Sequence, residues 1–363
     1  MYINFWYPVC TSAELEDKPL RVTLLTLRFA AFRDSAGVAH VVSDTCIHRG
    51  GSLSKGWVQG DNIVCPYHGW QYSGAGRCAK IPSQKTGSPP ARAKVDSYPV
   101  EERYGIVFAF LGDLPESERP AMFEIPEVGQ EGWRASIPAT RVVKCYYERS
   151  IENGLDPMHN EFVHPSQGLP KMREETVKIT ENEWGTHFIA AFGEQTAKPE
   201  GEKEIESDPN TLRAGSLYHG PNILVTDIHF DATSAFLQYA FEAPIDEEHT
   251  RIYLVNLRNC MMDPKLDERV IDINNKVADE DQVILEDLWP MRTPDTMNRE
   301  LLTTGDEIVV RYRKHLKEWD ARGWRIDARQ LRHNFGDVAY AIPSPERRNS
   351  GNWVLETVPL LAP

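Results

Sequence analysis

Short runs of alternating apolar and polar residues, separated by glycine and proline, dominate roughly the first third of the chain. Such runs are typical of half-buried strands. They predict strands at residues 22–27, 38–42, 63–65, 70–72 and 106–111. Because the turn-rich segments between them leave little room for helices, we predict a small all-β domain here.

The rest of the chain mixes two periods. A helical stretch near residues 146–153 is followed by alternating apolar runs at 223–230, 235–241 and 252–257. This combination is typical of an α+β domain with an antiparallel sheet. The charged segment 195–213, which glycine and proline interrupt, is open to two interpretations, a lid over a site or a plain surface loop.

Residues 115–130 are rich in Pro, Glu and Gly and show little hydrophobic period, which is typical of a linker. We therefore predict two domains, at residues 1–120 and 121–363. A chain of 363 residues is long enough to bury a core in each of them without disulfides.

The charge of the chain excludes some classes of partner. Its 54 acidic and 40 basic residues give a formal net charge of -14, which disfavours binding to nucleic acid or to anionic membranes. There is no apolar run of membrane-spanning length and no export signal at the amino terminus. We expect a cytoplasmic protein whose six cysteines remain thiols.

Two short loops each offer one thiolate and one imidazole. Cys46-x-His48 is followed, after sixteen residues, by Cys65-x2-His68. Structural zinc sites usually take a pair of cysteines and then a pair of histidines, whereas here the two ligand types alternate. The alternation suits a [2Fe-2S] cluster in which the thiolates hold one iron and the imidazoles the other. A zinc site and a chance match remain as alternatives.

The segment from Gly74 to Ala79 matches the G-x-G-x-x-A dinucleotide pattern, but no helix is predicted after it. A hairpin turn is the better interpretation. Binding of NAD(P)H or flavin is therefore expected of a partner protein.

A second constellation begins after the predicted helix. Asp156 precedes Pro157 and is predicted to cap a helix that carries His159 and His164. On a regular helix these histidines would lie about 140° apart, too far to share a metal. We therefore predict a distorted backbone between them. A zinc hydrolase is disfavoured, because the H-E-x-x-H spacing is missing.

The segment 265–289 supplies a candidate third ligand. Apolar residues at helical spacing predict a buried stripe, and Asp281 completes it; the apolar members are Leu266, Val270, Ile273, Val277, Ile284 and Leu288. A buried carboxylate has to be protonated, paired or metal-bound. With His159 and His164 it would form the two-histidine, one-carboxylate set of mononuclear non-haem iron oxygenases. A solvent-facing Asp281 at a helix end is the alternative.

On these motifs, together with Glu152-Asn153-x2-Asp156 and Glu280-Asp281, the chain resembles the α subunits of Rieske non-haem iron oxygenases over essentially its whole length. The resemblance implies an amino-terminal Rieske domain and a helix-grip catalytic domain. It implies a Rieske cluster on Cys46, His48, Cys65 and His68, and a mononuclear Fe(II) on His159, His164 and Asp281. Asn153 and Asp156 are the further catalytic candidates.

The resemblance also implies a head-to-tail homotrimer, in which Asp156 connects His159 to His68 of the partner subunit. A ferredoxin or flavin reductase would deliver electrons from NAD(P)H, and O2 would be the co-substrate. The expected reaction is hydroxylation or oxidative demethylation of a small, largely apolar and aromatic substrate. Asn222, Phe241 and Asn256 on the predicted sheet are candidate substrate contacts.

Two other functions remain open at this point. One is a ring cis-dihydroxylating dioxygenase, which would use the same metal sites. The other is a non-catalytic Rieske protein, whose second domain would carry no iron and would only dock a partner. The substrate, the position attacked and the donor protein do not follow from the residues.

Overall fold

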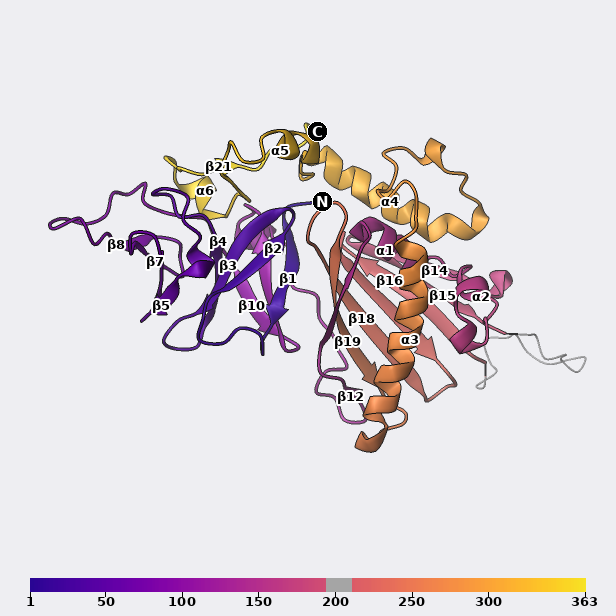
Figure 1. Ribbon diagram of the computed structural model, residues 1–363. Helices are drawn as coiled ribbons and strands as arrows, with labels where there is room; N and C mark the ends of the chain where they lie inside the picture. Colours follow the sequence, from indigo (N-terminus) through magenta and orange to yellow (C-terminus); the bar gives the residue numbers. More distant parts are fainter. Residues whose placement is uncertain (194–210) are drawn as a thin grey trace, which may run out of the picture. The chain divides into compact units, whose positions relative to one another are not determined.

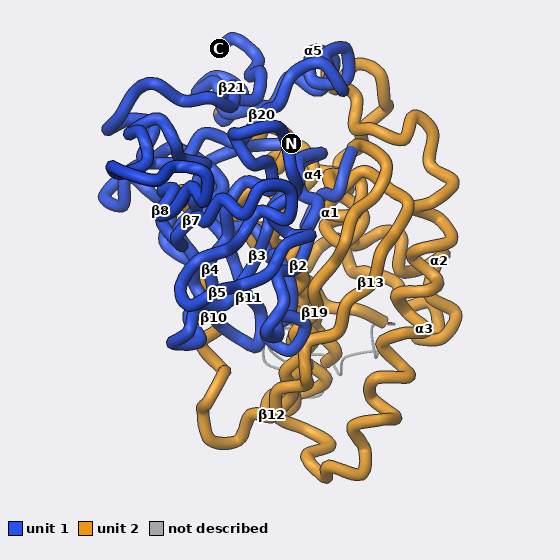
Figure 2. The backbone as a smooth tube through the Cα atoms, turned by 60° about the vertical axis from the view of Figure 1, so that its left-hand side comes forward, with its two compact units in different colours: residues 1–122, 243–246, 319–363 blue, residues 123–242, 247–318 orange. Residues whose placement is uncertain are grey.

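The computed structural model describes residues 1–193 and 211–363, and the chain divides into two compact units (Figure 2). Unit 1 consists of residues 1–122, 243–246 and 319–363, and unit 2 of residues 123–242 and 247–318. The candidate lid at 195–213 falls almost wholly outside the described residues. The C-terminal residues 319–363 belong to unit 1, and the domain boundary at residues 120 and 121 stays a prediction.

Unit 1 is built mainly from short antiparallel strands. In one sheet β1 (Phe5–Thr11) pairs with β11 (Ile106–Leu111), which also pairs with β10 (Val100–Arg103). Another sheet has the order β2 (Leu20–Leu24), β3 (Leu27–Arg33), β4 (Ala39–Ser43), β9 (Ser97–Tyr98). A further sheet has the order β5 (Trp57–Gln59), β6 (Asn62–Val64), β7 (Gln71–Ser73), β8 (Cys78–Lys80). The predicted all-β character of this region is confirmed.

The C-terminal part of unit 1 adds short elements. They are α5 (Ala328–His333), α6 (Glu346–Asn349) and the parallel pair of β20 (Tyr340–Ala341) with β21 (Glu356–Thr357). Arg347 donates to both carboxylate oxygens of the buried Asp96, at 2.7 and 2.8 Å. Because its charge is matched there, Asp96 ties the C-terminal segment to the strands of the same unit.

One predicted strand of unit 1 is wrong. The run at 22–27 spans β2 and the turn after it, where Leu25 and Thr26 have φ angles of 52° and 71°. The apolar pattern continues through the turn because Leu25 is fully buried, so periodicity alone hides the chain reversal. The G-x-G-x-x-A segment is the hairpin turn between β7 and β8, as predicted, and the Gly76 N–H donates to the Ser73 carbonyl.

Unit 2 contains a large antiparallel sheet, which confirms the predicted α+β class. In the described residues its order is β12 (Arg134–Ala135), β19 (Thr250–Arg258), β18 (Ala235–Pro244), β17 (Ile223–His229), β16 (Arg213–His219), β15 (Gly185–Ala191), β14 (Lys178–Asn182), and β13 (Ala139–Val143) also pairs with β19. Its helices are α1 (Tyr147–Leu155), the short α2 (Asn160–Val163), α3 (Asp267–Leu285) and α4 (Glu307–Ala321), of which the last enters unit 1 at Trp319. In Figure 1, α3 lies in front of the sheet and covers one of its faces.

Charged and apolar contacts fasten α3 to the sheet. At its start, Asp267 accepts hydrogen bonds from Arg134 and Arg258, which hold the pKa of this carboxyl well below its usual range. At its end, Leu285 packs with Ile252 in a buried cluster that also includes Ala240. The helix therefore runs antiparallel to β19, and the even-numbered residues of that strand face it.

The predicted apolar stripe on α3 is only partly right. Val270 is buried and Asp281 lies on the sheet-facing side, but Ile273, Ile284 and Leu288 are exposed. The side that faces the sheet carries Val270, Asn274, Val277, Asp281 and Leu285. Two helical stripes fit the same sequence, and the contacts at both ends of α3 select between them.

Within the described parts of the chain, the model contains no helix with the length and apolar character needed to cross a membrane.

Candidate functional site

Two histidines and a carboxylate from separate elements of unit 2 meet at one point. The Nε2 atoms of His159 and His164 lie 3.1 Å apart, and Oδ1 of Asp281 lies 3.5 and 3.4 Å from them. All three ligand atoms fall within 4.8 Å of one another, a grouping that could hold a metal ion. His164 is buried, and the other two side chains are partly exposed.

The backbone between the histidines is broken, which lets both imidazoles point the same way. Helix α1 ends at Leu155, and Asp156 is extended rather than helical. The next helix, α2, begins only after His159 and ends before His164, whose φ and ψ are -110° and 70°. The predicted helix from Pro157 is therefore wrong, whereas the predicted distortion is present. The cause is local, because residues that precede proline avoid the helical region.

Asp156 closes the end of α1 instead of capping a new helix. Its Oδ1 accepts a hydrogen bond from the Met158 N–H at 2.7 Å, and its carbonyl is bonded to Nδ1 of His159. Burial raises the pKa of Asp156 above its ordinary value, although the Met158 N–H opposes this. The backbone of Asp156 therefore orients His159, and Oδ1 anchors the chain at the break.

The three candidate ligands are held by further hydrogen bonds. Asn153 donates its Nδ2 to Oδ1 of Asp281 at 2.9 Å. Glu280 accepts from Nδ1 of His164 at 3.1 Å and from the hydroxyl and N–H of Ser166 at 2.8 and 3.1 Å. A partner on Nδ1 fixes the tautomer of the ring and leaves Nε2 available to a metal.

The charges around His159 act in opposite directions. Burial by itself would lower the pKa of this imidazole, but the bond to Asp281 and the charge of that carboxylate raise it above its ordinary value. The site is therefore electronegative, and it would favour a cation at the point where Nε2 faces the carboxylate.

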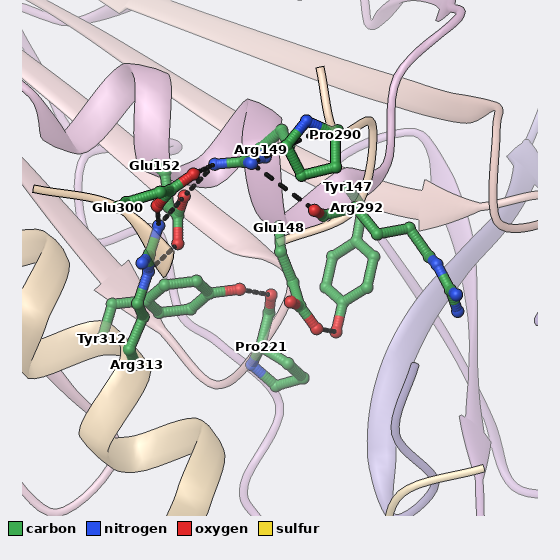
Figure 3. A network of polar contacts seen from close by, with 10 residues as sticks. All are labelled: Tyr147, Glu148, Arg149, Glu152, Pro221, Pro290, Arg292, Glu300, Tyr312 and Arg313. Atoms are coloured by element: carbon green, nitrogen blue, oxygen red, sulfur yellow. Dashed lines mark hydrogen bonds and ion pairs between the residues drawn. The ribbon is translucent and has the colours of Figure 1, made fainter. Parts of the chain in front are cut away.

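A buried ion-pair network behind α1 fixes the helix that carries Asn153 (Figure 3). Arg313 of α4 donates to both carboxylate oxygens of Glu152 at 2.6 and 2.8 Å, and it also reaches Glu300 at 2.7 Å. Arg149 lies 2.8 Å from Glu300 and donates to the carbonyl of Pro290 at 3.1 Å. Burial opposes the charge of Arg313, but the bonds to Glu152 raise its pKa above the ordinary value.

In unit 1 the two cysteine–histidine loops have matching turns. The Gly50 N–H donates to the Cys46 carbonyl and the Gly69 N–H to the Cys65 carbonyl, each at 2.9 Å, and both glycines have a φ of 70°. A side chain at Gly51 would place its Cβ 2.9 Å from the Sγ of Cys65. The repeated turn and the missing side chain leave room for an inorganic group between the loops.

The thiols and imidazoles of these loops differ in exposure. Cys46 and Cys65 are buried, whereas His48 and His68 are exposed, with ring centroids 4.4 Å apart. Burial raises the pKa of the Cys46 thiol to about 11, although the hydroxyl of Tyr72, 3.2 Å from its Sγ, opposes this. Loss of solvation and the nearby His48 lower the pKa of His68, which favours the neutral ring that a metal ligand requires.

The candidate substrate residues lie in different places. Asn256, in β19, shares the side of Leu254 and Arg258 that faces α3. Asn222 precedes β17 and donates to the Glu242 carbonyl at 3.1 Å. Phe241 alternates with Ala240 and packs against Phe123, so it lies on the sheet face away from α3.

Two residues support this site in a way that the sequence did not predict, although Glu280 is one of the residues that carry the family resemblance. Glu280 and Ser166 do not belong to the apolar stripe or to the spaced histidine pattern. The position of Glu280 directly before Asp281 is the one available signal, and it does not indicate contact with a histidine 116 positions earlier.

Comparisons with known proteins match both parts of the chain. The family model "Rieske [2Fe-2S] domain" matches residues 5–99, and the model "Vanillate O-demethylase oxygenase C-terminal domain" matches residues 143–322. These segments contain the two cysteine–histidine loops and the cluster of His159, His164 and Asp281, respectively.

Several relatives cover most or half of the chain. Methylxanthine N1-demethylase NdmA of Pseudomonas putida is 30% identical over 331 residues, covering 87% of this chain and 88% of that protein. Vanillate O-demethylase oxygenase subunit of Pseudomonas sp. (strain HR199 / DSM 7063) is 31% identical over 196 residues, covering 54% of each. The solved structure of Pseudomonas putida CBB5 NdmA with caffeine aligns with a TM-score of 0.73 at 26% identity, over 88% of this chain and 91% of that chain.

Proposed function

The chain belongs to the Rieske non-haem iron oxygenases, and from this premise we propose that it removes a methyl group oxidatively from oxygen or nitrogen of a small aromatic substrate. The observation that carries the proposal is the convergence of His159, His164 and Asp281 in a chain whose relatives are named as demethylases. In the overall reaction, the substrate methyl group, O2, two electrons and two protons give the demethylated product, formaldehyde and water.

The donor set of the site in unit 2 fits ferrous iron. Two imidazole nitrogens and one carboxylate oxygen leave one side of a metal open, whereas a structural zinc site would close all positions with protein ligands. When bound there, ferrous iron would supply the binding and activation of O2. His159, His164 and Asp281 would hold the metal, and Asn153 and Glu280 would keep two of these ligands in place.

The donor set in unit 1 fits a Rieske cluster in the same way. Two buried thiols and two exposed imidazoles on matching loops provide two ligands of each kind. The cluster would supply one-electron transfer, and the imidazole side is the one that faces solvent. We propose that a ferredoxin or flavin reductase delivers the electrons, because no dinucleotide-binding turn is present in this segment of the described chain.

We further propose that the working unit is a head-to-tail trimer, in which Asp156 contacts His68 of the partner subunit. The support is the position of Asp156 directly before the break that carries His159, together with the exposure of the His48 and His68 rings. A carboxylate between two metal-bound imidazoles would orient both rings and couple the two centres.

The test is a reaction of the purified protein with a reductase, NADH and O2. O-methyl and N-methyl aromatic compounds are supplied, and formaldehyde and product mass are measured. Loss of the methyl group with stoichiometric formaldehyde supports the proposal. A gain of two oxygen and two hydrogen atoms would instead identify a dihydroxylating dioxygenase. An iron content of two atoms per chain, all of it in the cluster, would instead identify a non-catalytic electron-transfer protein.

A further inference from the structure

The side of α3 that faces the sheet contains one polar residue that the metal site does not use. Asn274 lies between Val270 and Val277 on the side that ends in Asp281 and Leu285. Its Nδ2 is buried and has no hydrogen-bond partner. A buried amide N–H without an acceptor costs free energy. It therefore indicates that a ligand or a water molecule accepts this hydrogen bond.

A matching acceptor comes from the sheet. Asn256 in β19 has a buried Oδ1 that also lacks a partner, although its backbone N–H is bonded to the hydroxyl of Ser136 at 3.2 Å. Strand alternation places Asn256 on the same side as Leu254 and Arg258, and Arg258 contacts Asp267 of α3. Its side chain therefore points to the space between the sheet and α3.

The pairing of α3 with the sheet brings these two residues to the same level. Asp267 contacts Arg258, and Asp279 lies 2.5 Å from Arg141, the ladder partner of Ile252. Along the helix these contacts are about 18 Å apart, and along the strand about 20 Å. Asn274 follows Asp267 by seven residues and therefore lies about 10 Å further along the helix axis. The same distance along β19, measured back from Arg258, covers about three residues. This level is within about one residue of Asn256.

The distance to the candidate metal ligands is that of a small aromatic molecule. Asn274 precedes Asp281 by two helical turns on the same side, which is about 10 Å along the axis. Leu254 and Val277 lie between these levels and are apolar. A substrate that places its methyl group at His159 and Asp281 would therefore reach the two asparagines with its far end.

We infer that Asn256 and Asn274 bind a neutral substrate group with adjacent N–H and C=O functions, such as a primary amide, a lactam or a ureide. The inference rests on the proposed function, because it places the reacting methyl group at the metal site. Oδ1 of Asn256 accepts the substrate N–H, and Nδ2 of Asn274 donates to its carbonyl. A carboxylate has no donor for Asn256 and is therefore disfavoured.

One charged group nearby bears on this choice. Nη1 of Arg141 is buried without a partner, and its Nη2 donates to Asp279 at 2.5 Å. Arg141 lies at the level of Ile252 and Asp279, closer to the candidate metal ligands than to the asparagines, and because Asp279 balances its guanidinium it does not demand an anion. The surroundings therefore favour a neutral group.

The experiment measures binding and turnover with three probes that differ only in the far group. They are 4-methoxybenzamide, methyl 4-methoxybenzoate and 4-methoxybenzoate. Calorimetry on the holoenzyme gives dissociation constants, and formaldehyde release with reductase and O2 gives turnover. Variants are Asn256→Ala and Asn274→Ala, and the matched control is Asn275→Ala, the exposed neighbour on the same helix. Circular dichroism and thermal melting verify that each variant is folded.

We expect the wild type to bind the amide at least about tenfold more tightly than the ester, since one hydrogen bond is lost in the ester. Asn256→Ala should remove this preference. Asn274→Ala should weaken the binding of the amide and the ester alike, because both probes keep the carbonyl, and Asn275→Ala should change neither. Equal binding of amide and ester, no binding of the amide, or tighter binding of the carboxylate would overturn the inference. So would full selectivity in Asn256→Ala, or unchanged binding of both probes in Asn274→Ala. Selective binding without any formaldehyde would retain the inference and contradict the proposed demethylation.

Discussion

Replacement of Glu280 by alanine tests how far the metal site depends on a residue that is not itself a ligand. The Glu280 carboxylate accepts from Nδ1 of His164 at 3.1 Å and is held by Ser166 through bonds of 2.8 and 3.1 Å. Its side chain is 21% exposed, so water cannot fully replace it. In the variant, His164 loses the acceptor that fixes its tautomer and its orientation.

The magnitude follows from the kind of contact removed. Loss of the hydrogen-bond partner of a metal-bound histidine typically weakens metal affinity by about 10–100-fold, which is about 1.4–2.8 kcal/mol. Glu280→Gln keeps an oxygen that can accept from Nδ1 but removes the charge. We therefore expect this variant to lose about tenfold or less.

The assay is a titration of protein lacking the mononuclear metal with Co²⁺, followed by absorption of the bound ion, which requires no turnover. Glu268→Ala is the matched control, because Glu268 is exposed near the start of the same helix. His159→Ala is the comparison for loss of a ligand. The visible spectrum of the cluster should be the same in all variants. An unchanged Co²⁺ dissociation constant in Glu280→Ala would refute the reasoning.

Three other predictions follow from the same contacts. Asp156→Ala should leave iron and sulfide content unchanged while turnover falls at least about tenfold, because a bridging contact and not a ligand is lost; near-normal turnover contradicts the bridge. Burial raises the pKa of Glu242 to about 8, although the hydroxyl of Ser150 opposes this, so the folded protein binds the proton of this carboxyl more tightly than the unfolded chain does. The contribution of Glu242 to the free energy of unfolding therefore falls as the pH rises from about 4 to 8. Glu242→Gln should raise the free energy of unfolding at pH 8 more than at pH 4, by about 1–3 kcal/mol, as measured by urea unfolding at both pH values. Arg313→Met leaves Glu152 buried without its main partner and should cost about 3–5 kcal/mol, seen as a lower melting temperature; an unchanged melting temperature would show that the network does not stabilise the fold.

The residues of both candidate sites that are close in sequence could be found without a structure. Cys46 and His48 share one tight turn, and Cys65 and His68 share another, so their spacing is itself the geometry of the site. The same holds for the break that carries His159 and His164. A proline and the polar residue before it determine that break through local sterics alone.

Contacts between distant segments could not be found in this way. Glu280 and His164 lie 116 positions apart, and no period in either segment signals that they meet. Two stripes along α3 were compatible with its sequence, and the correct one depends on contacts with Arg258 and Ile252 of β19. Phe241 has an aromatic side chain that would suit a substrate pocket, but the alternation of side chains along its strand places it on the sheet face away from α3.

The sequence by itself thus determined the Rieske family, the two kinds of metal-ligand loop and the α+β character, because each is encoded in short spacings or in local periodicity. Tertiary structure alone decided that Asp281 faces the histidines and not the solvent, which residue supports His164 and which side of α3 faces the sheet. The physical reason is that burial of apolar area sets the rotation and level of a helix on a sheet, and that choice depends on all the packed residues together.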